Sequence, residues 1–378
     1  MNLVVKEISI YIHIPFCTKK CNYCDFYSVQ YKSDLVEKYV ACLKKEIEFT
    51  TSENKLRVKT IYFGGGTPSL LSFQHLYKII SKIRTSFEIS KNLEITLEAN
   101  PINVTKSSAK NWKICGINRI SLGAQSFHNS ELKILGRLHS KREINSAIET
   151  IKKFCTENIS LDLIYGIPFQ TIKKWKFSLE NAIKLAPKHI SSYCLSLEKG
   201  TYLFDKRAEY SFPTENEQSE MYYEMKKILE KNGFIQYEIS NFSQKIFEAK
   251  HNLNYWKCGE YFGFGPSAHS FFEMKRWNNF SNLKKYFNSF KDAKLPIEKS
   301  KKISQREFIS DKIVLGLRLN NGISIAELKE KYDFDTEKEY ENTLNKFFQT
   351  GYLTKQNDNL KLTPKALFVS NSILSEFV

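Results

Sequence analysis

Strand-like and helix-like segments alternate along the first 235 residues, and this alternation limits the fold more than any other feature of the sequence. Six segments rich in β-branched and aromatic residues are predicted strands: 8–14, 58–63, 93–98, 117–122, 159–165 and 190–197. Apolar residues recur at helical spacing over 34–50, 72–86, 105–114, 143–156, 171–185 and 215–232. Asp34 and Thr105 are predicted N-caps of two of these helices.

Strands that are each followed by a helix pair in parallel, because parallel neighbours need a crossover connection. Six such units are fewer than the eight that close a TIM barrel. The sequence therefore predicts an α/β fold, an open (βα)6 partial TIM barrel. Its ligands are expected at the carboxyl ends of the strands.

The sequence changes character after residue 235. Residues 251–270 are dense in His, Tyr, Trp and Gly, and residues 281–300 are Lys- and Asn-rich and loop-like. Predicted helices at 306–318, 324–332 and 336–350, a short β-pair and a final helix follow in the order of a winged helix. We therefore predict a core domain over 1–235, a connecting segment over 236–300, and a winged-helix-like C-terminal α+β domain over 301–378.

The net charge of +16 does not by itself indicate a nucleic-acid partner. Lys supplies most of the positive charge and is scattered along the chain, which is typical of a solvated basic surface. No stretch approaches the roughly 18 uncharged apolar residues of a membrane span. The first residues also lack the pattern of a signal peptide. We expect a cytoplasmic protein with no transmembrane segment and no nucleic-acid partner.

Three of the eight cysteines are clustered as Cys17-x3-Cys21-x2-Cys24, directly after the first predicted strand. Three thiolates can hold three irons of a [4Fe–4S] cube, whereas a standard cluster takes four cysteines. The open iron can then be chelated by the amine and carboxylate of S-adenosylmethionine. A zinc site with His13 as its fourth ligand, or three unrelated thiols, are the alternatives. The other five cysteines are spread out, and no disulfide is predicted.

A glycine-rich turn, Gly64-Gly65-Gly66-Thr67, ends the second predicted strand. Glycines allow a ligand to approach the backbone closely, and free N–H groups can bind a carboxylate or phosphate. No Gly-Lys-Ser/Thr follows, so this is not a Walker loop. A turn of this kind is usually only a turn. After the cysteine loop, however, it looks like the segment that holds the methionyl amino group.

This order of motifs resembles the radical-SAM superfamily, and within it the family of oxygen-independent coproporphyrinogen III oxidase. The resemblance covers nearly the whole chain. It implies a [4Fe–4S] cluster and an S-adenosylmethionine pocket lined by residues at matching positions: Tyr11, Tyr23, Gly65, Gly66, Thr67, Glu98, Gln125, Arg137 and Asp162. Taken singly, Glu98 and Asp162 could be helix caps, Gln125 a turn residue and Arg137 a surface residue. Their joint placement near strand ends favours the pocket, because buried carboxylates need partners.

Three features of the sequence resemble a sister group of the oxidase, the HemW-type heme chaperones. The residue after Cys24-Asp25 is Phe26, where the oxidase carries an additional cysteine. An H-N-x-x-Y-W motif follows at His251–Trp256, and a segment similar to the group's at 261–270. Neutral imidazole is a good axial ligand for heme iron, so His251 is the candidate heme ligand. Packing at a domain interface is the alternative for His251, and the role of His269 stays open.

The resemblance implies a heme chaperone that passes heme to acceptor hemoproteins, with a homodimer as a further expectation, rather than an enzyme. The cofactors and cargo are then a [4Fe–4S] cluster, S-adenosylmethionine and heme. The alternative is a radical-SAM oxidase that decarboxylates coproporphyrinogen III without oxygen. A winged-helix nucleic-acid binder is disfavoured, because the predicted C-terminal helices show no concentrated Arg or aromatic stripe.

Overall fold

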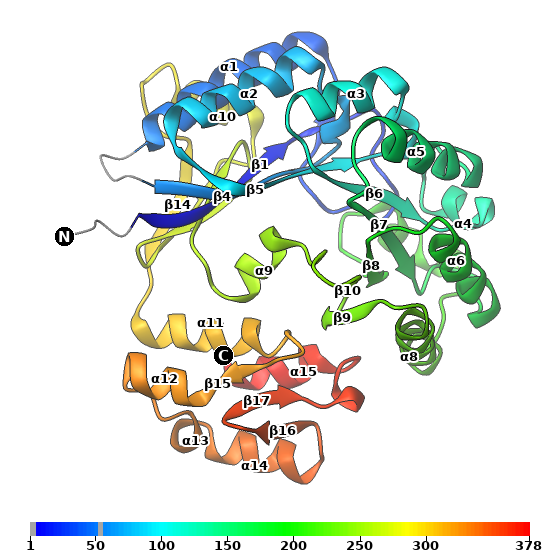
Figure 1. The fold of residues 1–378 in the computed structure, drawn as a ribbon, viewed down its shortest axis with the longest axis vertical. Helices are drawn as coiled ribbons and strands as arrows, with labels where there is room; N and C mark the ends of the chain where they lie inside the picture. The colour runs from blue at the N-terminus through cyan, green and yellow to red at the C-terminus, as the bar shows by residue number, and fades with distance from the viewer. Residues whose placement is uncertain (1–4, 52–55) are drawn as a thin grey trace.

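The computed structural model describes residues 5–51 and 56–378, and its main feature is one twelve-stranded sheet (Figure 1). Six neighbouring parallel strands form its centre, in sequence order: β1 (Lys6–Ile14), β4 (Leu56–Gly65), β5 (Glu88–Ala99), β6 (Arg119–Gln125), β7 (Ile159–Tyr165) and β8 (His189–Cys194). The two ends of the sheet do not pair with each other in the described residues. The six predicted strands and the open α/β fold are therefore confirmed.

The predicted crossover helices are also confirmed, and Figure 1 shows α1, α2, α3, α5 and α6 along one side of the sheet. Their bounds are α1 (Ser33–Thr50), α2 (Phe73–Ser86), α3 (Lys106–Ile114), α5 (Lys141–Phe154), α6 (Ile172–Lys184) and α8 (Glu215–Lys231), with the short α4 (Asn129–Ile134) and α7 (Tyr202–Asp205). Thr105 caps α3 as predicted, in a reciprocal pair with Ser108. Asp34 is not a cap: α1 begins one residue earlier, after Lys32, which makes no side-chain cap.

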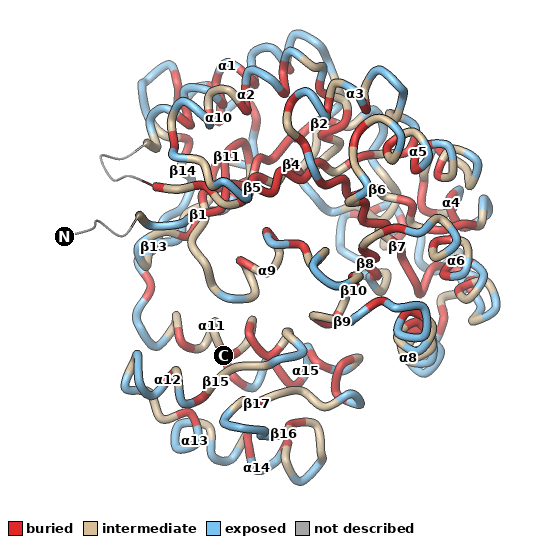
Figure 2. Tube along the Cα trace, in the orientation of Figure 1, coloured by how far each residue is buried: buried red, intermediate tan, exposed pale blue. Residues whose placement is uncertain are grey.

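Alternation along the strands separates an apolar face from a polar face. In β1, Ile8, Ile10 and Ile12 are fully buried in the main hydrophobic core with residues of α1 and α2. The residues between them, Ser9 and Tyr11, point to the opposite, inner face, because successive side chains of a strand alternate. Figure 2 shows the central strands as the most continuously buried part of the chain. The covered face builds the core, which leaves the inner face free to carry polar groups.

Residues 236–300 extend the sheet at both edges. Beyond β1 lie β11 (Tyr261–Phe264), parallel to it, and then the antiparallel β12 (His269–Phe272), β13 (Lys275–Asn279) and β14 (Ile297–Lys302). Beyond β8 lie β10 (Asn241–Ser243) and β9 (Ile235–Glu238). The loop-like prediction for 281–300 was wrong, since α10 (Leu283–Ser289) and β14 lie there. As an exposed edge strand, β14 carries lysines instead of alternating apolar residues.

A buried carboxylate joins α1 to this extension. Glu46 accepts hydrogen bonds from the Tyr286 hydroxyl (2.6 Å), the Gly265 amide (2.9 Å) and the Asn279 side chain. Burial raises the pKa of Glu46 to about 7, although these donors act in the opposite direction. The three donors come from β13, α10 and the end of β11, so one side chain fixes α1 against three elements.

The C-terminal residues form a second hydrophobic cluster, which comprises residues 309–377. Its elements are α11 (Gln305–Gly316), β15 (Ile323–Ser324), α12 (Ile325–Tyr332), α13 (Thr336–Glu339), α14 (Glu341–Gln349), β16 (Leu353–Gln356), β17 (Asn359–Leu362) and α15 (Ser370–Leu374). This is the predicted winged-helix-like order. Within residues 5–51 and 56–378, no helix is both long enough and apolar enough to cross a membrane.

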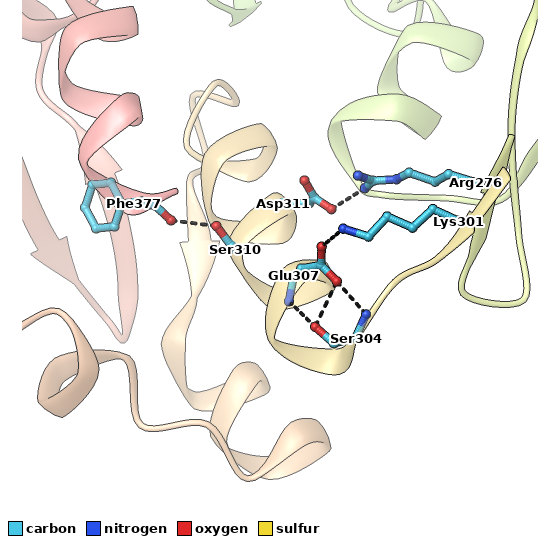
Figure 3. A network of polar contacts seen from close by, with 7 residues as sticks. All are labelled: Arg276, Lys301, Ser304, Glu307, Ser310, Asp311 and Phe377. Atoms are coloured by element: carbon cyan, nitrogen blue, oxygen red, sulfur yellow. Dashed lines mark hydrogen bonds and ion pairs between the residues drawn. The ribbon is translucent and has the colours of Figure 1, made fainter. Parts of the chain in front are cut away.

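Ion pairs join the C-terminal unit to the edge of the sheet (Figure 3). Arg276 of β13 pairs with Asp311 of α11, and Lys301 of β14 pairs with Glu307. Ser304 caps α11 in a capping box with the same glutamate. In Figure 1 the remaining helix, α9 (Lys250–Trp256), lies between the inner face of the sheet and this C-terminal unit. Helix α9 thus covers part of the inner face.

Candidate cluster and S-adenosylmethionine site

The three clustered cysteines lie on one loop at the carboxyl end of β1. Cys17 ends β2 (Phe16–Cys17), and the loop returns through β3 (Val29–Gln30), which pairs with β2 in parallel. The Tyr31 amide donates to the Cys17 carbonyl at 2.9 Å, and the Cys24 amide donates to the Cys21 carbonyl at 3.2 Å. All three thiols are free and partly exposed, and they line the same cavity.

Two side chains from other elements reach the thiols. The Arg137 guanidinium donates to Cys21 Sγ at 3.4 Å and to the Gly123 carbonyl at 2.9 Å. The Thr67 hydroxyl donates to Cys17 Sγ at 3.4 Å. Arg137 is therefore not a surface residue; it belongs to the cluster end of the cavity.

The donor set fits an iron–sulfur cube better than a single zinc ion. In a cube each thiolate binds a different iron, so the sulfurs need to face one space without meeting at one point. The described residues hold no group of three or more metal-ligating side chains around a common point. His13, the alternative fourth zinc ligand, has both ring nitrogens engaged, with the Tyr11 hydroxyl (3.1 Å) and the Tyr27 carbonyl (2.9 Å).

The glycine-rich turn packs directly on the cysteine loop. A Cβ atom on Gly66 would lie 2.8 Å from the Phe16 carbonyl oxygen and 3.0 Å from Cys17 Sγ, so only glycine fits there. The predicted free amides are not present at two positions, because the Gly66 and Thr67 amides donate to the Ile14 and Phe16 carbonyls. The Gly66 and Thr67 amides are therefore not free to bind a carboxylate or phosphate of a ligand.

Two half-buried carboxylates line the cavity, Glu98 from β5 and Asp162 from β7. Glu98 accepts from the Tyr62 hydroxyl at 2.8 Å, and Asp162 accepts from the Ser121 hydroxyl at 2.9 Å. Burial raises the pKa of Glu98 to about 7 and that of Asp162 to about 6. Neither residue caps a helix. Both carboxylates already accept protein hydroxyls, and they leave further acceptor capacity for hydroxyl or amino donors of a ligand.

The cavity has a volume of about 510 Å³ and brings most of the predicted residues together. Its lining includes Cys17, Cys21, Tyr23, Cys24, Gly65, Gly66, Thr67, Glu98, Gln125, Arg137 and Asp162. Gln125 has a left-handed backbone (φ 66°), which turns the chain at the end of β6. Tyr11 is absent from the lining, and its ring packs on Tyr62, with ring centroids 6.2 Å apart.

Sequence reasoning missed several polar residues of the inner face that also line the cavity: Tyr62, Arg119, Ser121, Ser191 and Tyr193. The signal that could have found them is the period of two along each strand. In β6, for example, Arg119, Ser121 and Gly123 share one face by this alternation, and Gln125 joins them in the cavity lining after a bulge. The apolar residues between them give the strand signal, and that signal says nothing about the function of the polar residues.

His251 lies on α9 and is buried, with 1% of its surface exposed. Its Nδ1 pairs with the Thr60 hydroxyl at 2.7 Å and its Nε2 with the Tyr255 hydroxyl at 2.9 Å. Burial, and then the charge of Arg119, lower the pKa of His251 to about 3, so the ring is neutral. It is not part of the cavity lining. His269 is exposed on β12.

Comparison with known proteins identifies the class to which this fold and site belong. Residues 11–182 match the radical SAM superfamily, and residues 303–369 match the HemN C-terminal domain. The structure resembles coproporphyrinogen III oxidase (HemN) from Escherichia coli, with a TM-score of 0.87 and 19% identity, over 99% of this chain and 90% of that one. The protein is thus a member of the radical-SAM superfamily with the fold of this oxidase.

Full-length relatives define the family more closely. The heme chaperone HemW of Bacillus subtilis is 33% identical over 98% of this chain and 99% of its own length. The heme chaperone HemW of Buchnera aphidicola subsp. Schizaphis graminum is 37% identical over 98% of both chains. The chain belongs to the family of HemW-type heme chaperones.

Proposed function

We propose that this protein binds one heme in the cytosol and passes it to acceptor hemoproteins. The observation that carries the proposal is the similarity to heme chaperones over 98% of the chain, at 33–37% identity. The neutral ring of His251 supports it chemically, because only a neutral imidazole can ligate iron. Heme here is cargo, which must be released as well as bound.

We also propose that the cavity holds two resident groups. Cys17, Cys21 and Cys24 would bind the [4Fe–4S] cluster, and S-adenosylmethionine would occupy the rest of the cavity. The residues proposed to contact S-adenosylmethionine are those given by the resemblance: Tyr11, Tyr23, Gly65, Gly66, Thr67, Glu98, Gln125, Arg137 and Asp162. When bound, these groups supply one-electron chemistry. In a chaperone they would support folding, dimerisation or redox control.

Replacing His251 by alanine tests the proposed heme ligand. We expect the variant to lose the Soret band of histidine-ligated heme and to bind heme about 10-fold more weakly or worse, since an axial bond is removed. Iron can reach Nε2 only after the Tyr255 hydroxyl leaves it. Tyr255→Phe should therefore bind heme at least as tightly as the wild type. Heme titrations followed by absorbance measure both effects.

The matched control is His269→Ala, which removes an exposed imidazole while leaving α9 intact. We expect its heme affinity to equal that of the wild type. If His251→Ala keeps the wild-type spectrum and affinity, His251 is a packing residue and heme binds elsewhere. Equal cluster content in all variants shows that the fold is retained.

The fold favours one second candidate, oxygen-independent oxidation of coproporphyrinogen III, because the structure superposes on the HemN oxidase with a TM-score of 0.87. Phe26 speaks against it: this residue stands at the position of the oxidase's additional cysteine, and it is 63% exposed at the cavity wall. Incubating reduced, cluster-loaded protein with coproporphyrinogen III and S-adenosylmethionine decides the question. We expect no decarboxylated product, and its formation would replace the chaperone proposal by the oxidase.

A further inference from the structure

Arg119 is a buried cation on the inner face of the sheet. It is the first residue of β6, and it shares its face with Ser121 because strand side chains alternate. Only 2% of its surface is exposed, yet it lines the cavity together with Asp162. Its charge contributes to the low pKa of His251, after burial. Arg119 thus stands near both the cavity and the proposed heme ligand.

No hydrogen bond or ion pair to this guanidinium is present in the part of the chain that the structure describes, although its charge helps to lower the pKa of Asp162 against the larger, raising effect of burial. Its Nε is buried without an acceptor. Within residues 5–51 and 56–378, no carboxylate lies within the 4.0 Å of an ion pair from its nitrogens. Arg137, the other arginine of the cavity, instead binds the Gly123 carbonyl and Cys21. Burying an unpaired charge costs several kcal/mol, so a side chain held this way calls for an anion.

We propose that Arg119 binds a carboxylate group of the ligand at the deep end of the cavity. This inference rests on the proposed function, whose ligands carry anions of one kind: S-adenosylmethionine has one carboxylate and heme has two propionates. A guanidinium matches a carboxylate through two parallel hydrogen bonds. Arg119 is therefore a specificity residue, which selects ligands by a carboxylate.

The position of Arg119 favours a heme propionate, and not the methionyl group, as the carboxylate that it binds. Arg119 and Gln125 are six positions apart along β6, which is at most roughly 20 Å at the usual rise of a strand, because a bulge precedes Gln125. Arg137 and the cysteine loop stand near the carboxyl end of the same strand. A methionyl group that reaches the cluster uses its carboxylate at that end. Arg119, at the other end of the strand and near His251, is then free to bind a propionate of heme.

The test compares each ligand with its ester in cluster-loaded protein. Heme and heme dimethyl ester are titrated into wild type, Arg119→Gln and Arg119→Lys, and S-adenosylmethionine and its carboxyl methyl ester are titrated in parallel. We expect the wild type to prefer heme over the diester by about 10- to 100-fold, the contribution of a charged hydrogen bond. Arg119→Gln should lose this preference, and Arg119→Lys should keep part of it. Arg306→Gln, which alters a side chain that is 75% exposed, is the control.

The other outcomes are distinct. If Arg119→Gln keeps its preference for heme but no longer distinguishes S-adenosylmethionine from the methyl ester, the site binds the methionyl carboxylate. If both preferences stay at the wild-type level, Arg119 binds no ligand carboxylate and the inference is overturned. If the wild type binds no heme at all, the chaperone proposal fails, and the S-adenosylmethionine arm still tests Arg119.

Discussion

Replacing Cys21 by alanine is expected to abolish binding of the iron–sulfur cluster and with it the brown colour of the reconstituted protein. With only Cys17 and Cys24 left on the loop, two irons of the cube would lack protein ligands instead of one. The substitution also removes the acceptor of the Arg137 guanidinium at 3.4 Å. The loss should be complete rather than graded, because the thiolates hold the cluster together.

Iron and inorganic sulfide analysis after anaerobic reconstitution measures this loss. The matched control is Cys194→Ser, because Cys194 lines the same cavity but is engaged with Gln218 Oε1 at 3.2 Å. We expect Cys194→Ser to keep the full cluster. A cluster lost in both variants would mean four thiolate ligands and no open iron. Zinc in the wild type, without sulfide, would contradict the cluster itself.

The central sheet could be predicted because its strands carry their own signal. In β1, isoleucines alternate with polar residues, and in β7 Ile159, Leu161 and Leu163 follow the same period. The edges gave no such signal. β11 contains a glycine at position 263, and β14 is rich in lysine, since an edge strand needs no buried side. Partners far along the chain, and not local propensity, make these segments strands.

The site could be predicted where a short motif fixes the chemistry. The cysteine loop and the glycine turn meet as expected, since both end neighbouring parallel strands. Whether a particular polar group is free or already hydrogen-bonded could not be predicted from the sequence. The Gly66 amide is already bonded to the Ile14 carbonyl, and His251 is held by Thr60 and Tyr255. Such partners depend on how distant elements pack, which no local pattern records.

Replacing Glu98 by glutamine is expected to weaken S-adenosylmethionine binding while making the ligand-free protein more stable. Burial, as the larger effect, and the nearby Asp162 raise the pKa of Glu98 from 4.5 to about 7, against the hydrogen bond from Tyr62. Ligand hydroxyls donate better to the ionised form. Loss of a charged acceptor should lower the affinity about 10- to 100-fold.

The same pKa fixes how stability depends on pH. Between about pH 4.5 and 7 the folded protein keeps a proton on Glu98 that the unfolded chain releases, so stability falls as the pH rises through this window. Glutamine has no proton to lose. At about pH 8 the free energy of unfolding of the ligand-free variant should therefore exceed that of the wild type by on the order of 1–3 kcal/mol.

Calorimetric titration of S-adenosylmethionine and thermal unfolding, each at about pH 6 and about pH 8, separate the two effects. Wild-type affinity should rise with pH as Glu98 ionises, whereas the affinity of Glu98→Gln should stay flat.

Glu88→Gln is the control, because Glu88 lies on the same strand but at its exposed start, paired with Arg57. A variant that binds S-adenosylmethionine as the wild type does would remove Glu98 from the site. A gain in stability without a loss of affinity would mean that Glu98 serves neither S-adenosylmethionine binding nor the stability of the fold. The two readouts together decide whether Glu98 is kept for the ligand. If its removal stabilises the fold and weakens binding, its role is in binding and not in stability.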